Sequence, residues 1–479
     1  MAQNYYFFWK LVSFIKLNSV KPGKIYADYE DNFVILAQKL RAMRNKNRFM
    51  MLLAVVAVLA VASCRRNVFD EDKYIELVKI QSPVDSIDAS HTFSTTTAYP
   101  LKVSATVITQ RGNQETTVNV GAKRLRILTG DPASGEAATI LADVYCKDGD
   151  QLDLTFAAPV GLTHFYAALV DSVYYTVKPF TADETSINFT NPRVTHARRL
   201  REPTNQVYTY CYEDEQPEAN EYCYNDVVLR MSFERTGETE INLNVSLAAV
   251  GSSKKLSAAI RLPGYQYADI ESVTTVGDEK GEGETFDGDY NVTGQAGLPQ
   301  DGLLMRANKT NEAVIRLFED AHWAIDPNVT MENGLITRKT YNVTKTTSVD
   351  NELVNPRSIT YKIKFKSGVD LNQFRLDNID PFVVNDYNGL MWEIHLYPFQ
   401  GTEVFHEYSL VNSVKLLPWA ILVPKGDFRY PILGYNIGYF KKGALFGTYM
   451  TRGHSFGEWV ENQATSTDWY NYPTLNMAF

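Results

Sequence analysis

The chain has 479 residues, 12% of them aromatic, and a formal net charge of −9. This length is enough for two or three domains with a sizeable core. Residues 1–63 have a net charge of +6, which leaves −15 for residues 64–479. An acidic body repels phosphate backbones, so nucleic acid is excluded as a partner. The abundance of tyrosine and phenylalanine favours strands over helices.

The first predicted element is an export signal. Arg41–Arg48 contains four basic residues, and Phe49–Ala62 is an unbroken apolar run of 14 residues. A transmembrane helix needs about 20 apolar residues, so this run fits the core of a signal peptide instead. Small residues then lead directly to Cys64. We predict a lipoprotein signal peptide at residues 43–63, with cleavage before Cys64 and lipid attached to its thiol.

Residues 1–42 do not fit a signal peptide, because their apolar pieces are broken by Pro22, Gly23 and acids. Met43 begins a conventional basic segment, so we interpret residues 1–42 as an overlong N-terminal extension. The alternative is that these residues belong to a genuine signal peptide with a long basic N-terminal region. Residues 64–75 are polar and are predicted to be a tether. Two or three acyl chains on Cys64 would hold the protein stably to a membrane.

Residues 76–195 are predicted to form a β-sandwich. Short segments rich in β-branched and aromatic residues alternate with turn signals every 8–15 residues or so, and no long helical period occurs. Asp148-Gly149-Asp150 is predicted to be a hairpin turn. The basic stretch His196–Glu202 is predicted to be a linker.

Residues 205–479 are predicted to form a larger β-rich domain, sandwich or jelly-roll-like, so the whole chain is assigned to the all-β class. Ile241–Leu247 and Ile359–Lys366 alternate strictly between apolar and polar residues, as a half-buried strand does. Val276–Gly302 is rich in glycine and acids and is predicted to be a long surface loop. Ala313–Asp326 is ambiguous, with a strand followed by a short helical turn as one interpretation.

Several motifs in this region occur in the order of a known family. They are Tyr224–Val228, Ala313–His322, Trp392–Leu396, Leu417–Ala420 and Phe428–Pro431, and they include Asp320, His322, His395 and Trp419. With these motifs, residues 205–479 resemble the LruC domain, a C-terminal domain of exported lipoproteins of Gram-negative bacteria. The resemblance implies an all-β domain and no established activity.

Two acidic stretches are candidates for calcium, which prefers oxygen ligands. The resembled family usually has alternating aspartates in its opening motif, and here Cys223 replaces one of them. The remaining candidates are Glu221, Asn225 and Asp226 in that motif, and Asp287 and Asp289 in a glycine-rich loop. The alternative for Asn225 and Asp226 is hydrogen bonding to backbone amides at the turn before the next strand. A solvated loop is the alternative for the second stretch. No other cofactor is predicted.

Three cysteines remain after the lipidation site. Cys211 and Cys223 are twelve residues apart and could form a disulfide in an oxidising compartment, with Cys146 as a buried thiol. Three unpaired buried thiols are the alternative.

Catalytic motifs are weak. Gly453–Gly457 matches the G-x-S-x-G pattern, but no histidine follows Ser455 and no αβ alternation precedes it. The chain has no HExxH, P-loop or dinucleotide-binding pattern. A glycosidase needs only two distant carboxylates and is not excluded. We predict that the protein is not an enzyme.

The sequence therefore predicts an outer-membrane lipoprotein, on the cell surface or facing the periplasm, that is anchored through lipid. Its predicted role is non-enzymatic binding, adhesion or structure, with a glycan or a protein surface as ligand. Exposed tryptophans among the five of the C-terminal domain would favour glycan binding. One alternative is a fimbrial or surface-assembly subunit matured by proteolysis near Arg199 or Arg201. The other alternative is a periplasm-facing or surface protein that binds or hydrolyses glycans.

Overall fold

The computed structural model describes residues 84 and 86–479, except for 215–221, 277–285, 287–302, 327–330, 333–334, 337–338, 388–389, 403–416, 441–442 and 445–453. The signal peptide, the tether and Cys64 lie outside the described residues. Within the described part of the chain, no helix is long and apolar enough to cross a membrane.

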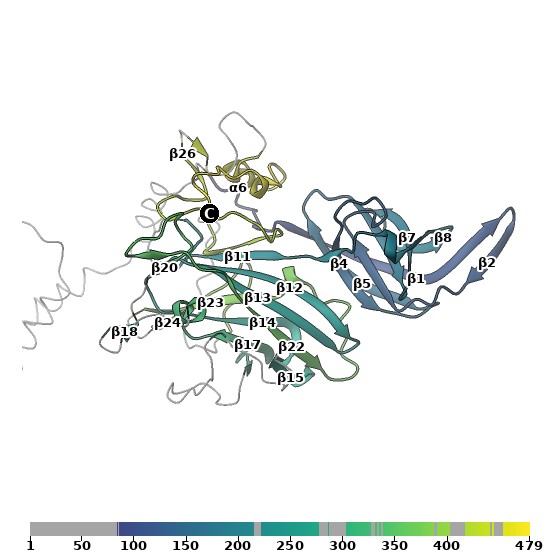
Figure 1. Cartoon of the computed structure of the whole chain (residues 1–479), viewed down its shortest axis with the longest axis horizontal. Helices are drawn as coiled ribbons and strands as arrows, with labels where there is room; N and C mark the ends of the chain where they lie inside the picture. The colour runs from purple at the N-terminus through teal and green to yellow at the C-terminus, as the bar shows by residue number, and fades with distance from the viewer. Residues whose placement is uncertain are drawn as a thin grey trace, which may run out of the picture. The chain divides into compact units, whose positions relative to one another are not determined.

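Residues 96–205 form a sandwich of two sheets (Figure 1). The first sheet contains β1 (Thr96–Arg111), β2 (Gln114–Val118), β5 (Gln151–Pro159) and β8 (Ser186–Thr190). The second has the order β10 (Thr204–Asn205), β4 (Thr139–Tyr145), β3 (Arg124–Leu128), β6 (His164–Val170), β7 (Tyr174–Thr181) and β9 (Arg193–His196). Leu125, Phe156 and Phe165 are fully buried between the sheets.

The C-terminal domain also contains two packed sheets. The larger has the order β15 (Ile270–Thr275), β22 (Arg357–Phe365), β13 (Glu240–Val250), β12 (Val227–Gly237), β11 (Tyr208–Tyr212) and β25 (Ala420–Val423), with β20 (Thr340–Tyr341) beside β13 and β21 (Asn351–Glu352) beside β20. The smaller has the order β16 (Leu304–Arg306), β17 (Glu312–Phe318), β14 (Leu256–Gln266), β23 (Asp380–Tyr387) and β24 (Leu390–Ile394). The prediction of an all-β fold is confirmed.

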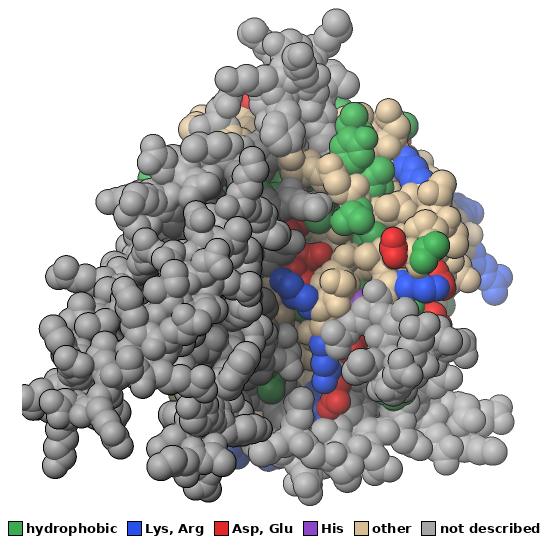
Figure 2. Space-filling view, turned by 90° about the vertical axis from the view of Figure 1, so that its left-hand side faces the viewer, with side chains coloured by type: hydrophobic (Ala, Val, Ile, Leu, Met, Phe, Trp, Pro, Cys, Tyr) green, Lys and Arg blue, Asp and Glu red, His purple; other side chains and the backbone are tan. Residues whose placement is uncertain are grey.

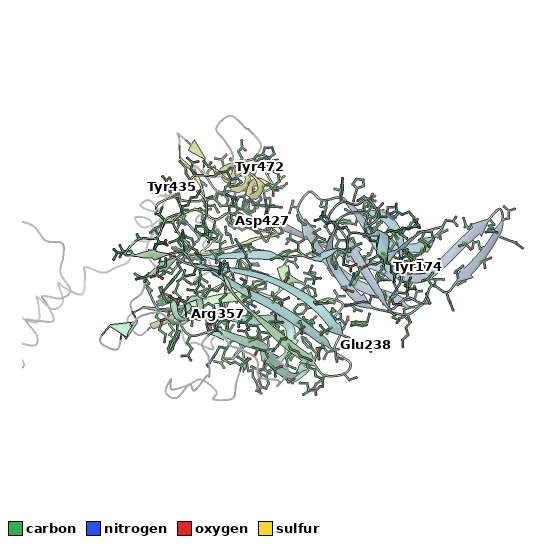
Figure 3. The ribbon with its side chains drawn as sticks, in the orientation of Figure 1. Tyr174, Glu238, Arg357, Asp427, Tyr435 and Tyr472 are labelled. Atoms are coloured by element: carbon green, nitrogen blue, oxygen red, sulfur yellow. The ribbon has the colours of Figure 1, made fainter. Side chains whose placement is uncertain are left out.

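Short elements complete the described structure. Two strand pairs join β18 (Met331–Glu332) with β19 (Leu335–Ile336) and β26 (Tyr439–Phe440) with β27 (Gly443–Ala444). The helices are α5 (Ala321–Ile325) and α6 (Phe456–Glu461), and the 3-10 turns are η1 (Ala197–Arg199), η2 (Tyr267–Asp269), η3 (Leu376–Asn378) and η4 (Trp469–Asn471). Figure 2 views the molecule from the side of β18, β20 and β24, and Figure 3 adds the side chains to the view of Figure 1.

The two strictly alternating segments pair with each other. β13 and β22 are antiparallel neighbours, with Ile241 opposite Ile363 and Leu243 opposite Tyr361. These apolar side chains point to the smaller sheet and are buried in the main core of the domain. The alternate residues, such as Lys362, point away from it. Burial of one face explains why the pattern has a period of two.

The last part of the chain covers the opposite face of the larger sheet. Cys211 on β11 and Val228 on β12 point to this side and pack with Trp459 of α6 in a second hydrophobic cluster. Tyr210 and Leu229, one residue away on each strand, point into the main core. β11 and the first three residues of β12 are therefore buried on both faces, which explains why these stretches are rich in apolar and aromatic residues.

The segment before β1 packs on the C-terminal domain. We call residues 84 and 86–95 the strap. The backbone amide of Asp88 donates to the carbonyl of Val460 at 3.0 Å, and a ring nitrogen of His91, Nε2, lies 2.9 Å from the carbonyl of Trp459. The Thr95 hydroxyl donates to the carbonyl of Leu422. The sequence assigned these residues to the N-terminal sandwich, but the strap bonds to α6 and β25 and meets the sandwich at its end, where the Thr95 carbonyl accepts the amide of Val160.

Two local predictions need revision. Asp148-Gly149-Asp150 connects β4 of one sheet to β5 of the other, so it is not a hairpin turn. Its Asp148 carboxylate instead accepts the amides of Val120 and Gly121. The stretch His196–Glu202 contains η1, where Nδ1 of His196 accepts the amide of Arg198 at 3.1 Å. This turn packs on the sandwich through partly buried apolar side chains, while its arginines are exposed.

Candidate functional site

Buried polar side chains gather at one end of the C-terminal domain, which we call the polar end. They come from the end of β11, the turn before β12, the β13–β14 connection, the N-terminus of α5 and the end of β23. These residues are Glu213, Asp214, Asn225, Asp226, Ser252, Asp320, His322 and Asn385, all at most 8% exposed. The polar end therefore joins the opening motif and the central motif that the sequence analysis singled out.

Asp214 lies at the centre of the polar end. Its backbone amide donates to Oδ2 of Asp226 at 2.8 Å, and its own carboxylate accepts the Ser252 hydroxyl. The Lys254 ammonium is 3.3 Å from Oδ1 of Asp214, and the Asn385 amide donates to the Asp214 carbonyl. Each contact compensates the desolvation of a buried polar group, which would otherwise oppose folding.

His322 connects α5 to the β13–β14 connection. Asp320 is the N-cap of α5 and accepts the backbone amide of His322 at 3.0 Å, as capping carboxylates do. The same oxygen is 2.9 Å from Nδ1 of the His322 ring, and Nε2 is 2.8 Å from the carbonyl of Ser252. Both ring nitrogens of this fully buried histidine are thus occupied by protein groups.

The opening motif is held by close backbone contacts. The side-chain amide of Asn225 donates to the carbonyl of Pro431 at 2.8 Å, and its Oδ1 faces the thiol of Cys223 at 3.2 Å. A Cβ atom on Gly251 would overlap the side chain of Asn225 and lie 2.7 Å from its carbonyl oxygen. Only glycine allows this close approach of two chain segments.

These contacts bear on the calcium prediction. Asn225 and Asp226 are described, and the oxygens that would bind the ion already face the Cys223 thiol and the Asp214 amide. Glu221, Asp287 and Asp289 lie outside the described residues. Among the residues that the structure describes, no three His, Cys, Asp or Glu side chains are arranged to hold a metal ion. Of the two described candidates, Asp226 accepts a backbone amide, that of Asp214, whereas Asn225 bonds to the Pro431 carbonyl and the Cys223 thiol.

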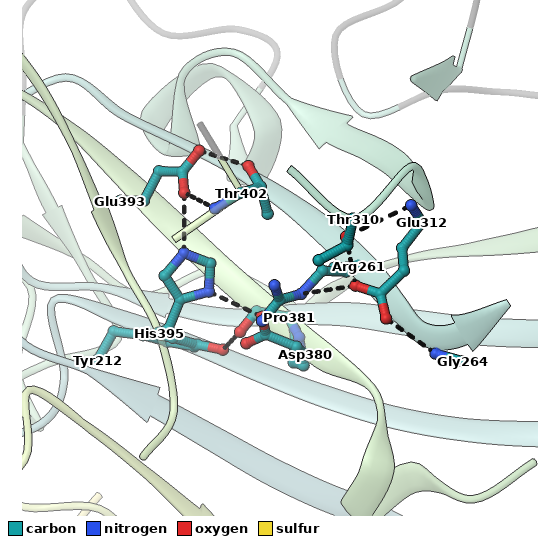
Figure 4. A network of polar contacts seen from close by, with 10 residues as sticks. All are labelled: Tyr212, Arg261, Gly264, Thr310, Glu312, Asp380, Pro381, Glu393, His395 and Thr402. Carbon is teal, nitrogen blue, oxygen red and sulfur yellow. Dashed lines mark hydrogen bonds and ion pairs between the residues drawn. The ribbon is translucent and has the colours of Figure 1, made fainter. Parts of the chain in front are cut away.

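His395 forms a second buried centre, on the outer face of the smaller sheet (Figure 4). Its Nδ1 is 2.8 Å from Oδ2 of Asp380, and its Nε2 is 3.0 Å from Oε2 of Glu393. Phe382 stacks on the ring at 4.6 Å. Oε1 of Glu393 also accepts the Thr402 hydroxyl at 2.6 Å. We call these residues, with Arg261 and Glu312, the His395 centre.

The charges of the His395 centre stabilise its ionised forms. Burial lowers the pKa of His395, but the charges of Asp380 and Glu393 and their hydrogen bonds outweigh it and raise that pKa to about 9. For Glu393, burial raises the pKa, but His395 and Thr402 reverse this effect and lower it. The imidazole is therefore a cation at neutral pH, held between two carboxylates.

Arg261 and Glu312 extend this centre across the sheet. Arg261 on β14 is the register partner of Asp380 on β23, and its guanidinium is 2.7 Å from Oδ2 of that residue. Oε1 of Glu312 accepts the amide of Gly264 at 3.0 Å. Asp380 therefore lies between two cations, and His395 lies between two anions. This alternation lets several charges share a dry environment.

Trp419, the last family-motif candidate, packs beside the polar end. Its ring stacks on Tyr222 at 6.3 Å with an interplanar angle of 11°, and its carbonyl accepts the amide of Glu213 at 2.8 Å. Of the five tryptophans in the C-terminal domain, Trp323 on α5 is exposed (41%), next to buried His322. An exposed indole at the polar end is the feature that could contact a ligand.

The predicted disulfide is wrong. Cys211 and Cys223 are buried thiols that are not joined to each other, and Cys146 is a third buried thiol. Cys211 points into the cluster around Trp459, and the Cys223 thiol faces Asn225. Burial raises the pKa of Cys146 to about 12 and also raises that of Cys211, so both remain protonated.

Ser455 is a helix cap. Its hydroxyl accepts the amide of Glu458 at 3.0 Å, and the Glu458 carboxylate accepts the amide of Ser455, which is a capping box at the start of α6. The G-x-S-x-G match therefore has a structural explanation. His454 is near Asp468 (3.0 Å) and stacks on Tyr472, which also belong to this surface region.

Sequence reasoning missed several residues of the two centres. Asp214, Ser252 and Asn385 in the polar end, and Arg261 and Asp380 in the His395 centre, have no motif of their own. Strand register brings Arg261 to Asp380, whereas Asp214 and Ser252 lie in the connections that follow β11 and β13. The acids two residues before each histidine, Asp320 and Glu393, were visible in the sequence.

Comparisons with known proteins give a family match without a function. Residues 239–470 match the family described as Domain of unknown function (DUF4842). A crystal structure of a predicted lipoprotein from Bacteroides ovatus is similar to the chain, with 15% identity and a TM-score of 0.44. The similarity covers 75% of this chain and 99% of that chain. No curated protein matches. The matched residues include His322 and the His395 centre, while Asp214, Asn225 and Asp226 of the polar end precede them.

Proposed function

We propose that the chain is an exported lipoprotein, anchored to the outer membrane through lipid on Cys64, whose folded part works as a non-enzymatic binding module. One observation carries the anchor: a basic stretch, a 14-residue apolar run and small residues directly precede Cys64. These residues lie outside the described structure, so the support comes from the sequence.

The chemistry of the two histidine centres supports a role without catalysis. A general base must reach a substrate proton within hydrogen-bonding distance. The side chains of His395, Glu393 and Asp380 are at most 1% exposed, and both ring nitrogens of His395 contact carboxylates. His322 is equally buried, and the Ser455 hydroxyl caps α6. These groups are used to hold the fold together.

The anchor is tested by changing its cysteine. Cys64→Ala removes the thiol that would carry the lipid, so the protein should lose label from an alkyne fatty acid and leave the membrane fraction. Cys146→Ala is the matched control, because Cys146 is buried within the sandwich and should keep both label and membrane location. Equal labelling of wild type and Cys64→Ala would contradict the anchor.

Trp323 supports a glycan as the ligand. Its indole is exposed at the polar end, and a flat aromatic ring can stack on the apolar face of a sugar. We expect Trp323→Ala to weaken binding to a responsive glycan on an array by about tenfold, or roughly 1.4 kcal/mol. Tyr174→Ala is the control, since Tyr174 is similarly exposed on the sandwich (Figure 3). Unchanged binding by the Trp323 variant would contradict recognition at this end.

A further inference from the structure

Three surface turns of the C-terminal domain carry exposed apolar side chains. The exposed side chains are Val349, Leu433, Tyr435 and Leu475, and we call them the apolar patch. The turns read TKTTSV (344–349), ILGY (432–435) and YPTLNM (472–477). They contain no acidic residue, although the chain has 56 of them and residues 64–479 have a net charge of −15.

The three turns are joined to each other by hydrogen bonds. The amide of Leu433 donates to the carbonyl of Val343 at 2.8 Å, and the Lys345 ammonium donates to the carbonyl of Leu475. The amide of Ile432 donates to the carbonyl of Met477 at 3.0 Å. The patch is therefore one surface rather than scattered residues. Figure 2 shows apolar side chains gathered in the upper right part of this side of the molecule.

The strap reaches the fold beneath this patch. Val84 and Ile87 belong to the same hydrophobic cluster as Met477 and Phe479. Met477 is two residues from Leu475 of the patch. Val84 is the first described residue, twenty positions after Cys64. A lipid on Cys64 would thus be connected to the C-terminal domain at the cluster that supports the apolar patch.

We propose that the apolar patch contacts the lipid surface to which Cys64 is anchored, an inference that rests on the proposed anchor. Contiguous exposed apolar residues mark interaction surfaces. Tyrosine suits a membrane interface, because its ring is apolar and its hydroxyl polar. An acidic body is repelled by anionic headgroups, and the three turns themselves contain no carboxylate, the exposed Asp350 being the residue that follows Val349. The anchor raises the local concentration of lipid, so weak contacts suffice.

Spin labels test this contact on the mature, lipidated chain. Leu475→Cys places a label in the patch, and Val118→Cys places one on β2 of the sandwich as the matched control. The native Cys146, Cys211 and Cys223 are buried, so the new cysteines are the ones that react. The proteins are reconstituted into phosphatidylcholine vesicles, and each label is probed with oxygen and with a water-soluble nickel chelate.

We expect the label at position 475 to become at least threefold less accessible to the nickel chelate and more accessible to oxygen when vesicles are present, while the label at 118 is unchanged. The double variant Leu433→Ser/Tyr435→Ser should reverse this protection without releasing the protein from vesicles. If the protein floats with vesicles but position 475 stays as accessible as 118, the patch proposal is overturned. If the label at position 475 is already protected from the nickel chelate without vesicles, the membrane contact is overturned and the patch is covered by a second copy of the chain instead. If the protein does not float at all, the anchor itself fails, and the patch proposal fails with it.

Discussion

The N-terminal sandwich and the C-terminal domain are both two-sheet β structures, but their interiors are filled differently. Between the sheets of the sandwich, aromatic rings such as Phe156, Phe165 and Phe180 pack within 5.0 to 6.1 Å of one another. Outside its core the sandwich buries one carboxylate, Asp143, beside Arg124 and Arg126. The C-terminal domain has a comparable apolar core, and in addition it buries two histidines, His322 and His395, with their carboxylate partners.

The two kinds of interior differ in how well they tolerate substitutions. An apolar core tolerates changes that keep volume and pattern. A buried ionic network tolerates little, because each charge depends on a particular partner. The His395 centre joins β14, β23 and β24 to the segment around Thr402, so it fixes which parts of the chain meet. The comparison predicts that the C-terminal domain responds to charge and pH far more than the sandwich.

The largest effect is expected from removing Asp380. Asp380→Ala leaves Arg261 and His395 buried with one anion fewer, so we expect a loss of about 3–5 kcal/mol in the free energy of unfolding of the C-terminal domain. Tryptophan fluorescence in urea measures this domain selectively, because residues 76–204 contain no tryptophan. Asp427→Ala, at an exposed position, is the control. A loss below about 1 kcal/mol for Asp380→Ala would show that the network is not needed.

The second effect is alkaline destabilisation. The pKa of His395 is raised to about 9 in the fold, against about 6.5 when unfolded, so its stabilisation is complete below pH 6.5 and is lost as pH rises through 9. The expected loss is roughly 3 kcal/mol, from 1.36 kcal/mol per pKa unit. His395→Gln should flatten this profile between pH 6.5 and 9. An unchanged slope in the variant would assign the effect to another group.

A smaller effect of opposite sign is expected at the strap. Burial lowers the pKa of His91, while its hydrogen bond to Trp459 acts against this, so the ring contributes stability above pH 6.5 that is lost as pH falls. His91→Leu leaves the Trp459 carbonyl without this donor and should cost about 1–3 kcal/mol. Hydrogen exchange at Asp88, whose amide bonds to Val460, reports strap release. Equal exchange at pH 5 and pH 8, after correction for intrinsic rates, would contradict this role.

The smallest effect is expected at an exposed ion pair. Lys364 and Glu271 are 2.7 Å apart across β22 and β15, but both side chains are about half exposed. Water and salt screen such pairs. Lys364→Ala should therefore leave the urea midpoint unchanged within error. A clear shift would mean that surface charge also stabilises this domain, which would blur the contrast with the buried centres.

The sequence predicted those parts of the fold in which a residue's environment follows from its own strand. Strict alternation identified β13 and β22, because one face of each strand is buried and the other is not. The segment Ala313–Asp326 indeed contains a strand, β17, followed by the short helix α5. His322 and His395 were singled out by motif, and both are buried in polar centres.

The remaining features depend on contacts between distant residues. Asp380 meets Arg261 because β23 and β14 pair in one register, and no spacing in the sequence encodes that register. Cys211 faces the cluster of α6, and the Cys223 thiol faces Asn225, so twelve-residue spacing alone could not decide their pairing. The strap has no periodic pattern, and its position on α6 could not be inferred.

The most direct test of the proposed function is the mass of the mature N-terminus. The protein would be purified from membranes of cells that express the whole gene, and its N-terminal peptide would be analysed by mass spectrometry. Our account predicts a peptide that begins at Cys64 and carries diacylglycerol, with or without an additional acyl chain. A mature chain that begins at another residue, or an unmodified Cys64, would contradict the lipid anchor and the membrane contact inferred from it.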